Sequence, residues 1–206
     1  MKGMRLWRAA LAMNLAACLL PAFGASAEPD RQGRQGGRGD ESRAVMEEGI
    51  AYMNGDGVEQ DYEAAMERFL AAAEAGSMKA SRYVGMLYEQ GLGVEQDYSQ
   101  AAEWYEKGTA AGDLTSGYYL GLLYARGLGV EQDYARAAEL FGSVAESENK
   151  SATGVVDAGY ELARLYEQGL GVDADMEKAL ALYQEAADGG SEAAREALDR
   201  LAAADQ

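Results

Sequence analysis

A short string recurs along the chain at a regular interval, and this repetition constrains the fold more than any other feature. Copies of the string Gly-x-Gly-Val, each followed by an acidic residue, begin the segments 55–62, 91–98, 127–134 and 169–176. The second glycine recurs after 36, 36 and 42 residues, so the last unit carries six additional residues. Periods of this length are typical of helical repeat arrays, in which each unit packs on its neighbours.

Each unit predicts a first helix with a constant pattern. An aspartate near the end of the string precedes this helix, and aspartate stabilises helix N-termini by accepting hydrogen bonds from unpaired amides. Alanine follows four residues later and an aromatic residue eight later, so both lie on one helix face. We expect the alanine to permit close approach of a second helix and the ring to fill the space beside it. The sets are Asp61, Ala65 and Phe69; Asp97, Ala101 and Tyr105; Asp133, Ala137 and Phe141; and Asp175, Ala179 and Tyr183.

A second helix is predicted in each unit, beginning near Ser77, Asp113 and Asp157. Gly85 and Gly121 recur in the middle of these helices. Because a mid-helix glycine costs about 1 kcal/mol relative to alanine, its recurrence predicts that neighbouring helices touch there. The additional residues of the last unit fall around 147–152, where polar side chains predict a loop.

The first 27 residues predict an export signal. Lys2, Arg5 and Arg8 precede an apolar run, and Ala25-Ser26-Ala27 has the form of a cleavage site. We therefore expect a periplasmic or secreted protein, cleaved after Ala27. Cleavage removes three cations and no anion, so the net charge changes from −17 to −20. No second apolar stretch follows, so no membrane span is expected in the mature chain.

The segment before the first repeat is glycine- and arginine-rich and has no apolar residue between Arg31 and Gly39. We predict a flexible linker at 28–41 and the repeat array at 42–204. The signal itself contains an alternative, because Leu15-Ala16-Ala17-Cys18 resembles the cleavage box of bacterial lipoproteins. A lipid anchor at Cys18 would tether the protein to a membrane.

Several repeat motifs together resemble one known family. The stretches that carry the resemblance are Leu120-Gly121 with Tyr124, Gly127-x-Gly129-Val130, and Asp97-Tyr98 with Trp104-Tyr105. They resemble the Sel-one-like repeat family, which is similar to tetratricopeptide repeats, over residues 43–203. The resemblance implies an all-α fold, a right-handed α-solenoid of about four stacked helix-pair repeats with a C-terminal capping helix. It also implies an adaptor function, because members are mostly adaptors and many bacterial ones are exported.

The composition excludes several kinds of chemistry. There is no histidine, and the only cysteine lies in the signal, so His-containing catalytic triads and His- or Cys-based metal sites are excluded. A net charge of −17 argues against a nucleic-acid partner. We therefore predict a protein that is not an enzyme, with no catalytic residues, no cofactor and no bound metal. Some cysteine-rich members of the family are associated with β-lactam hydrolysis, so a hydrolase is kept as a distant alternative.

The resemblance to tetratricopeptide repeats also suggests a binding surface. In those proteins the helix that bears the Leu-Gly pair lines the concave face of the array. The sequence therefore predicts an exported protein-interaction module that docks a protein or peptide partner in this groove, although the convex face stays open as an alternative. A structural subunit or lipoprotein of an envelope or secretion assembly is the second interpretation. The predicted partner-binding residues are Lys79, Arg82, Met86, Tyr118, Leu122, Tyr160 and Arg164.

Overall fold

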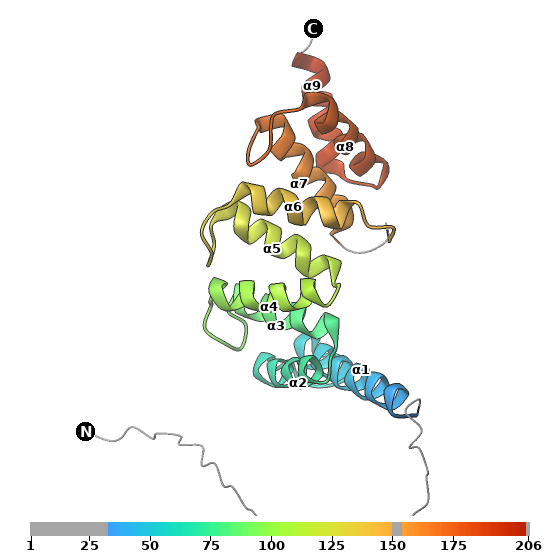
Figure 1. Ribbon diagram of the computed structural model, residues 1–206. Coiled ribbons are helices and arrows are strands. Elements are labelled where there is room, and N and C mark those ends of the chain that lie inside the picture. Colours follow the sequence, from blue (N-terminus) through green and yellow to red (C-terminus); the bar gives the residue numbers. More distant parts are fainter. Residues whose placement is uncertain (1–32, 150–153, 205–206) are drawn as a thin grey trace, which may run out of the picture. The chain divides into compact units, whose positions relative to one another are not determined.

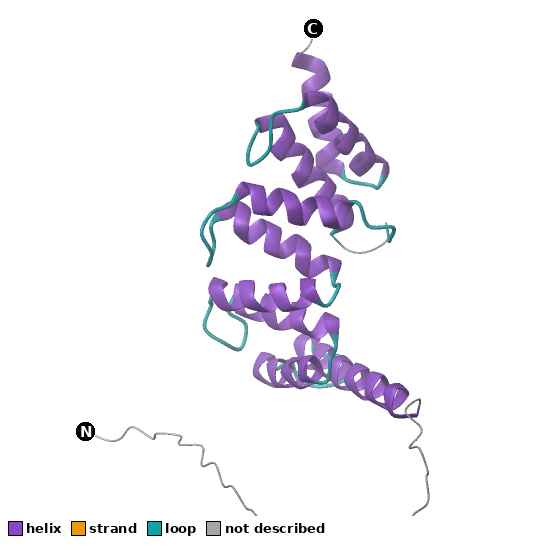
Figure 2. Ribbon diagram, viewed as in Figure 1, coloured by secondary structure: helices purple, strands orange, loops and turns teal. Residues whose placement is uncertain are grey.

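The computed structural model describes residues 33–149 and 154–204. All regular elements in these two ranges are α-helices (Figure 2). The predicted signal peptide and the possible lipid site at Cys18 lie outside the described residues. The helices are α1 (Gly33–Asn54), α2 (Tyr62–Glu74), α3 (Met78–Gln90), α4 (Tyr98–Ala110), α5 (Leu114–Arg126), α6 (Tyr134–Ala145), α7 (Val155–Gln168), α8 (Met176–Asp188) and α9 (Glu192–Ala204).

The helices of the described region form a stack in chain order (Figure 1). Each helix packs against the next one along the chain. In addition, α3 touches α5 and α5 touches α7, whereas no two even-numbered helices in the described ranges make a comparable contact. Because α3, α5 and α7 approach one another more closely than the even-numbered helices do, these three helices line the inner side of the stack. The predicted all-α repeat fold is confirmed.

The predicted start of the even-numbered helices is confirmed. Asp61, Asp97, Asp133 and Asp175 each have extended backbone, and each side chain accepts a hydrogen bond from an amide at the start of the following helix. The alanine and the aromatic ring predicted to face the core are fully buried in all four helices. The local pattern of the repeat therefore specifies both the start and the buried face of each even-numbered helix.

The glycines of the odd-numbered helices lie directly under these buried rings. A Cβ on Gly85 would lie 2.7 Å from Cε1 of Tyr105, and one on Gly121 would lie 2.6 Å from Cε1 of Phe141. Real Cβ atoms do not approach a ring so closely, so the missing side chain is what lets the two helices meet. The predicted contact at Gly85 and Gly121 is confirmed.

Two boundaries differ from the sequence prediction. Helix α1 begins at Gly33, inside the segment predicted as a linker. Helix α7 begins at Val155 rather than near Asp157, because Gly154 provides its N-cap with a positive φ of 91°. The additional residues of this unit interrupt the 36-residue register, and the start of α7 moves with them. The residues of this insertion at 150–153 lie outside the described part of the chain.

Candidate protein-binding surface

The seven predicted partner-binding residues lie on three odd-numbered helices. Helix α3 carries Lys79, Arg82 and Met86; α5 carries Tyr118 and Leu122; α7 carries Tyr160 and Arg164. Lys79 and Arg164 are exposed, whereas the other five are half-buried. We refer to the surface formed by these helices and α9 as the odd-helix face.

Arg82 is already engaged by a carboxylate of its own chain. Its Nη1 lies 3.3 Å from Oδ1 of Asp113, and only 18% of the Arg82 side chain is exposed. Asp113 also caps α5 by accepting hydrogen bonds from the backbone N–H and the hydroxyl of Ser116. This pair joins α3 to the start of α5. Arg82 therefore serves mainly to hold two repeats together, and its charge is not fully available to a partner.

The two tyrosines expected to anchor a partner are held by other rings. The Tyr118 ring centroid lies 5.4 Å from that of Tyr119 and 6.1 Å from that of Phe141. The Tyr160 ring is tilted against Tyr183 at 5.7 Å. Burial, together with the nearby Asp157 carboxylate, raises the pKa of Tyr118 to about 12. Its hydroxyl therefore stays protonated at neutral pH and can donate a hydrogen bond.

Arg164 lies between two hollows of the odd-helix face. One hollow, of about 220 Å³, lies between α5 and α7 and is lined by Leu122 and Arg126 among others. The other, of about 210 Å³, lies between α7 and α9 and is lined by Tyr160 and Arg200 among others. Arg164 lines both hollows. The structure thus brings Leu122, Tyr160 and Arg164 together around α7, whereas Lys79, Arg82, Met86 and Tyr118 line neither hollow.

Arg126 and Arg200 line these hollows but were not among the predicted residues. A signal existed for Arg200, because it follows Arg164 by 36 residues and therefore occupies the same register on α9. Arg126 occupies no such register, and only the folded chain places it beside Arg164. The residue at the repeat position of Arg164 changes from apolar to cationic along the array. In chain order, this position holds Ile50, Met86, Leu122, Arg164 and Arg200.

The arginines that line the second hollow are each paired with one carboxylate. Nη1 of Arg164 lies 2.8 Å from Glu161, and Nη2 of Arg200 lies 2.9 Å from Glu167. Burial raises the pKa of Glu167, but hydrogen bonds from the Tyr183 hydroxyl and Arg200 outweigh it, and the net shift is downward. Glu167 therefore stays ionised and holds Arg200 in place at neutral pH.

The described residues contain no group of carboxylates placed to hold a metal ion. None of the described helices is long and apolar enough to cross a membrane. A Ser-x-x-Lys spacing, which serine β-lactamases use, occurs at Ser147 and Lys150. The Ser147 hydroxyl accepts a hydrogen bond from the amide of Asn149 in the loop after α6, and Lys150 lies outside the described part of the chain. The hydrolase alternative gains no support from this loop.

Four consecutive segments match the family described as Sel1 repeat, and together they cover more than half of the chain. They are residues 49–77, 79–113, 118–149 and 156–191. The chain belongs to the Sel1 repeat family. Sel1 repeat proteins are generally protein-interaction modules and typically act as non-enzymatic scaffolds.

Two solved Sel1-type structures resemble this chain. A Sel1 repeat protein from Oxalobacter formigenes is 28% identical with a TM-score of 0.68, over 80% of this chain and 64% of that one. A protective antigen of uropathogenic Escherichia coli strains, described as displaying an SLR fold, is 30% identical with a TM-score of 0.54, over 82% of this chain and 43% of that one. This chain thus spans less than two thirds of the length of either protein. No curated protein matches it significantly.

Proposed function

We propose that this protein is an exported interaction module that docks a segment of a partner protein along the odd-helix face. The observation that carries the proposal is the pair of hollows on either side of Arg164. Two adjacent hollows on the inner side of a helical stack suit an extended or helical peptide that places one side chain in each. Membership of the Sel1 repeat family supports the same function.

The arginine side chains of this region support one chemistry for the segment. Arg126, Arg164 and Arg200 line the two hollows together with Glu161, Glu167 and Glu196, in a chain whose net charge is −17. A guanidinium has five N–H donors, so an arginine paired with one carboxylate can still bind another. We expect carboxylates of the partner beside Arg164 and Arg200, and an apolar side chain beside Leu122. The paired arginines are then preorganised and need little reordering on binding.

Site-specific photo-crosslinking in the native cell tests this assignment. A crosslinking residue at Gln168, which lines both hollows, should capture a partner that the same residue at Glu103 on α4 does not. Reversing the charge of Arg164 should weaken capture at Gln168, because a carboxylate partner is then repelled. The matched control is Arg136→Glu, which reverses an exposed arginine on α6. Capture that occurs at Glu103 and not at Gln168 would assign binding to the even-numbered helices instead.

The export part of the proposal has a separate test. The form of the protein recovered outside the cytoplasm should begin at Glu28. A mass increase corresponding to a lipid on Cys18 would instead support the membrane-anchored alternative. Recovery of the exported protein with an intact Met1 would contradict both.

A further inference from the structure

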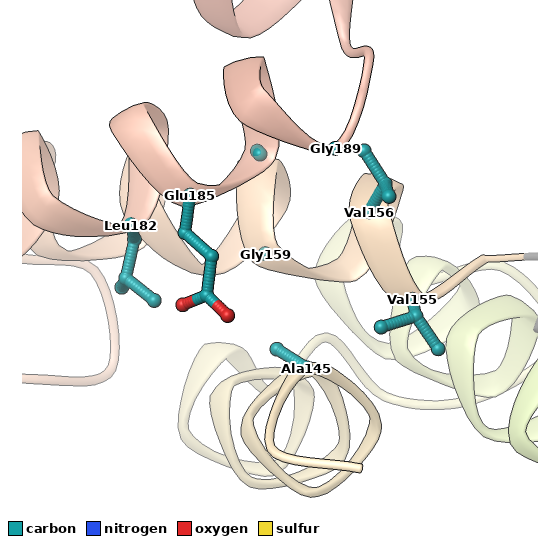
Figure 3. Close-up of a pocket in the computed structure, with 8 residues that line it drawn as sticks. Ala145, Val155, Val156, Gly159, Leu182, Glu185 and Gly189 are labelled. Carbon is teal, nitrogen blue, oxygen red and sulfur yellow. The ribbon is translucent and has the colours of Figure 1, made fainter. Parts of the chain in front are cut away.

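A further hollow lies where α6, α7 and α8 meet (Figure 3), and the α7 residues that line it are not those that line the two hollows of the odd-helix face. Its cavity has a volume of about 210 Å³. Figure 3 shows Leu182 and Glu185 reaching from α8 towards α6, and the methyl group of Ala145 facing them from α6. We refer to this cavity as the junction pocket. Its lining residues are Ala145, Val155, Val156, Gly159, Leu182, Glu185, Ala186 and Gly189.

The junction pocket exists because the chain has small side chains where the preceding junction has larger ones. At Gly117, one repeat earlier, a Cβ would lie 3.0 Å from Cγ2 of Val144 and 3.6 Å from Cγ2 of Thr109. The corresponding residues beside Gly159 are Ala186 and Ala145, and the nearest atom there is Cβ of Ala186 at 3.9 Å. The space over α7 therefore arises because alanines occupy the two positions that valine and threonine occupy at the preceding junction.

The lining of the pocket is also less polar than that of the preceding junction. The buried Asp113, which caps α5, corresponds in register to Val155, whose side chain faces the pocket. Among the described residues that line the pocket, Glu185 supplies the one ionisable side chain. An apolar cavity of about 150 Å³ is large enough to take a benzene ring in another protein, so the junction pocket has room for a Leu or Phe side chain.

The junction pocket continues into a larger groove between α6 and α8. The groove has a volume of about 850 Å³ and shares Ala145, Leu182 and Glu185 with the pocket. Two further carboxylates line it: that of Glu146, and that of Glu139, which is paired with Arg136 at 2.8 Å. Lys178, the one lysine among the described residues of the lining, donates a hydrogen bond of 2.7 Å to the hydroxyl of Tyr166 and lies over that ring. The groove is thus acidic around an apolar hole.

We propose that the junction pocket binds an apolar side chain of a second, basic protein segment, whose Lys or Arg residues face Glu185 and Glu146. The apolar hole selects the anchor residue, and the carboxylates around it select the flanking charge. This site goes beyond the docking of an acidic segment on the odd-helix face. Both surfaces include residues of α7, but their other helices, their charged side chains and their expected occupants differ.

The test uses the mature chain and a short synthetic peptide in which one Phe is flanked by lysines. Amide resonances of Ala145, Gly159 and Ala186 should shift on titration and reach saturation. A peptide with Ala in place of Phe should bind at least about tenfold more weakly, because the anchor is lost. A peptide with Glu in place of the lysines should also bind more weakly.

Variants of the chain make the test specific to the pocket. Ala145→Thr with Ala186→Val restores the side chains of the preceding junction, and should weaken peptide binding at least about tenfold while the fold is kept. Glu185→Gln should weaken binding severalfold, whereas Glu177→Gln, the same charge change on an exposed residue of α8, should not. Arg164→Glu should leave peptide binding unchanged, which separates this site from the odd-helix face.

The proposal is overturned if no resonance of the pocket shifts, or if filling the pocket leaves the affinity unchanged. If the double variant does not fold, Gly159→Ala replaces it, because a Cβ there meets only one atom within 4 Å. This smaller change should also weaken binding, and unchanged affinity would again overturn the proposal.

Discussion

The junction of α4, α5 and α6 and the junction of α6, α7 and α8 use the same repeat positions, yet only the first is tightly filled. Val144 and Thr109 cover Gly117, whereas two alanines leave space over Gly159. Contacts within a helix pair are kept in both regions, because Phe141 and Tyr183 are fully buried. The repeat thus fixes how one helix pairs with the next and leaves the space beside the pair free to vary.

A second contrast separates the interior of the array from its start. Gly129 has a φ of +70°, and a Cβ on it would overlap the backbone of Tyr98 and Ser99 at the start of α4. Gly57 has a similar φ of +76°, but nothing lies within 4 Å of its Cβ position. Interior loops are therefore packed against the preceding repeat, while the first loop is not.

The largest expected effect tests this second contrast. Gly129→Ala combines an unfavourable backbone conformation with a backbone clash, so we expect a loss of more than about 3 kcal/mol in the free energy of unfolding. Gly57→Ala introduces the unfavourable backbone conformation without a clash, and should lower the free energy of unfolding by about 1 kcal/mol. Denaturant unfolding measures both. Equal losses would show that the interior loop does not pack on α4.

Exchanging side chains between the two junctions should have the next largest effect. Val144→Ala opens a gap over Gly117 and should destabilise the protein by about 1–2 kcal/mol, because a buried valine loses its contacts. Ala186→Val adds the same atoms where space exists and should cost much less. Thermal unfolding of the two variants compares them directly. A larger loss for Ala186→Val would mean that the junction pocket is not open space.

A smaller effect is expected from the matched glycines of α5 and α7. Gly159→Ala should raise stability by about 1 kcal/mol, because alanine favours helix and the added methyl meets only Ala186 at 3.9 Å. In Gly117→Ala the same gain in helix stability is opposed by a close contact, because the added Cβ would lie 3.0 Å from Cγ2 of Val144. We therefore expect little net change there. If both variants gained equally, the difference in packing between the junctions would be unsupported.

The pH dependence of stability gives the smallest predicted effect. The pKa of Tyr118 is raised from 10.0 to about 12, chiefly by burial. Because the folded pKa is the higher one, the folded state holds the proton more tightly. The contribution of the protonated Tyr118 hydroxyl to the free energy of unfolding is fully present below about pH 10 and is lost as the pH rises towards 12. Between these pH values the melting temperature of Tyr118→Phe should fall less than that of the unsubstituted protein, as thermal unfolding would measure. An identical pH profile for both proteins would show that Tyr118 titrates as an exposed tyrosine.

The sequence predicts the parts of the fold that depend on local spacing. The aspartate caps, the buried alanine–aromatic faces and the contacts at Gly85 and Gly121 all follow from one repeat period. The start of α7 was misplaced, because the insertion breaks that period. The pairing of Arg82 with Asp113 was not predicted, because it joins residues of different repeats.

The candidate site could be predicted only in part. Register alone identifies the positions of the odd-numbered helices that are not fully buried, including Leu122, Tyr160 and Arg164. Which of them border a hollow depends on the packing of successive repeats, and this is not visible in a single repeat. The junction pocket was missed for the same reason, since Ala145 and Ala186 are ordinary helix residues until Thr109 and Val144 are aligned with them.

Hydrogen exchange of the complex with the captured partner tests docking on the odd-helix face. Docking there should slow amide exchange at the C-terminal turns of α5 and α7 and along α9, where Arg126, Arg164 and Arg200 line the hollows. Exchange in α2 and α4 should not change. Protection confined to the even-numbered helices, with none in α7, would contradict docking on the odd-helix face.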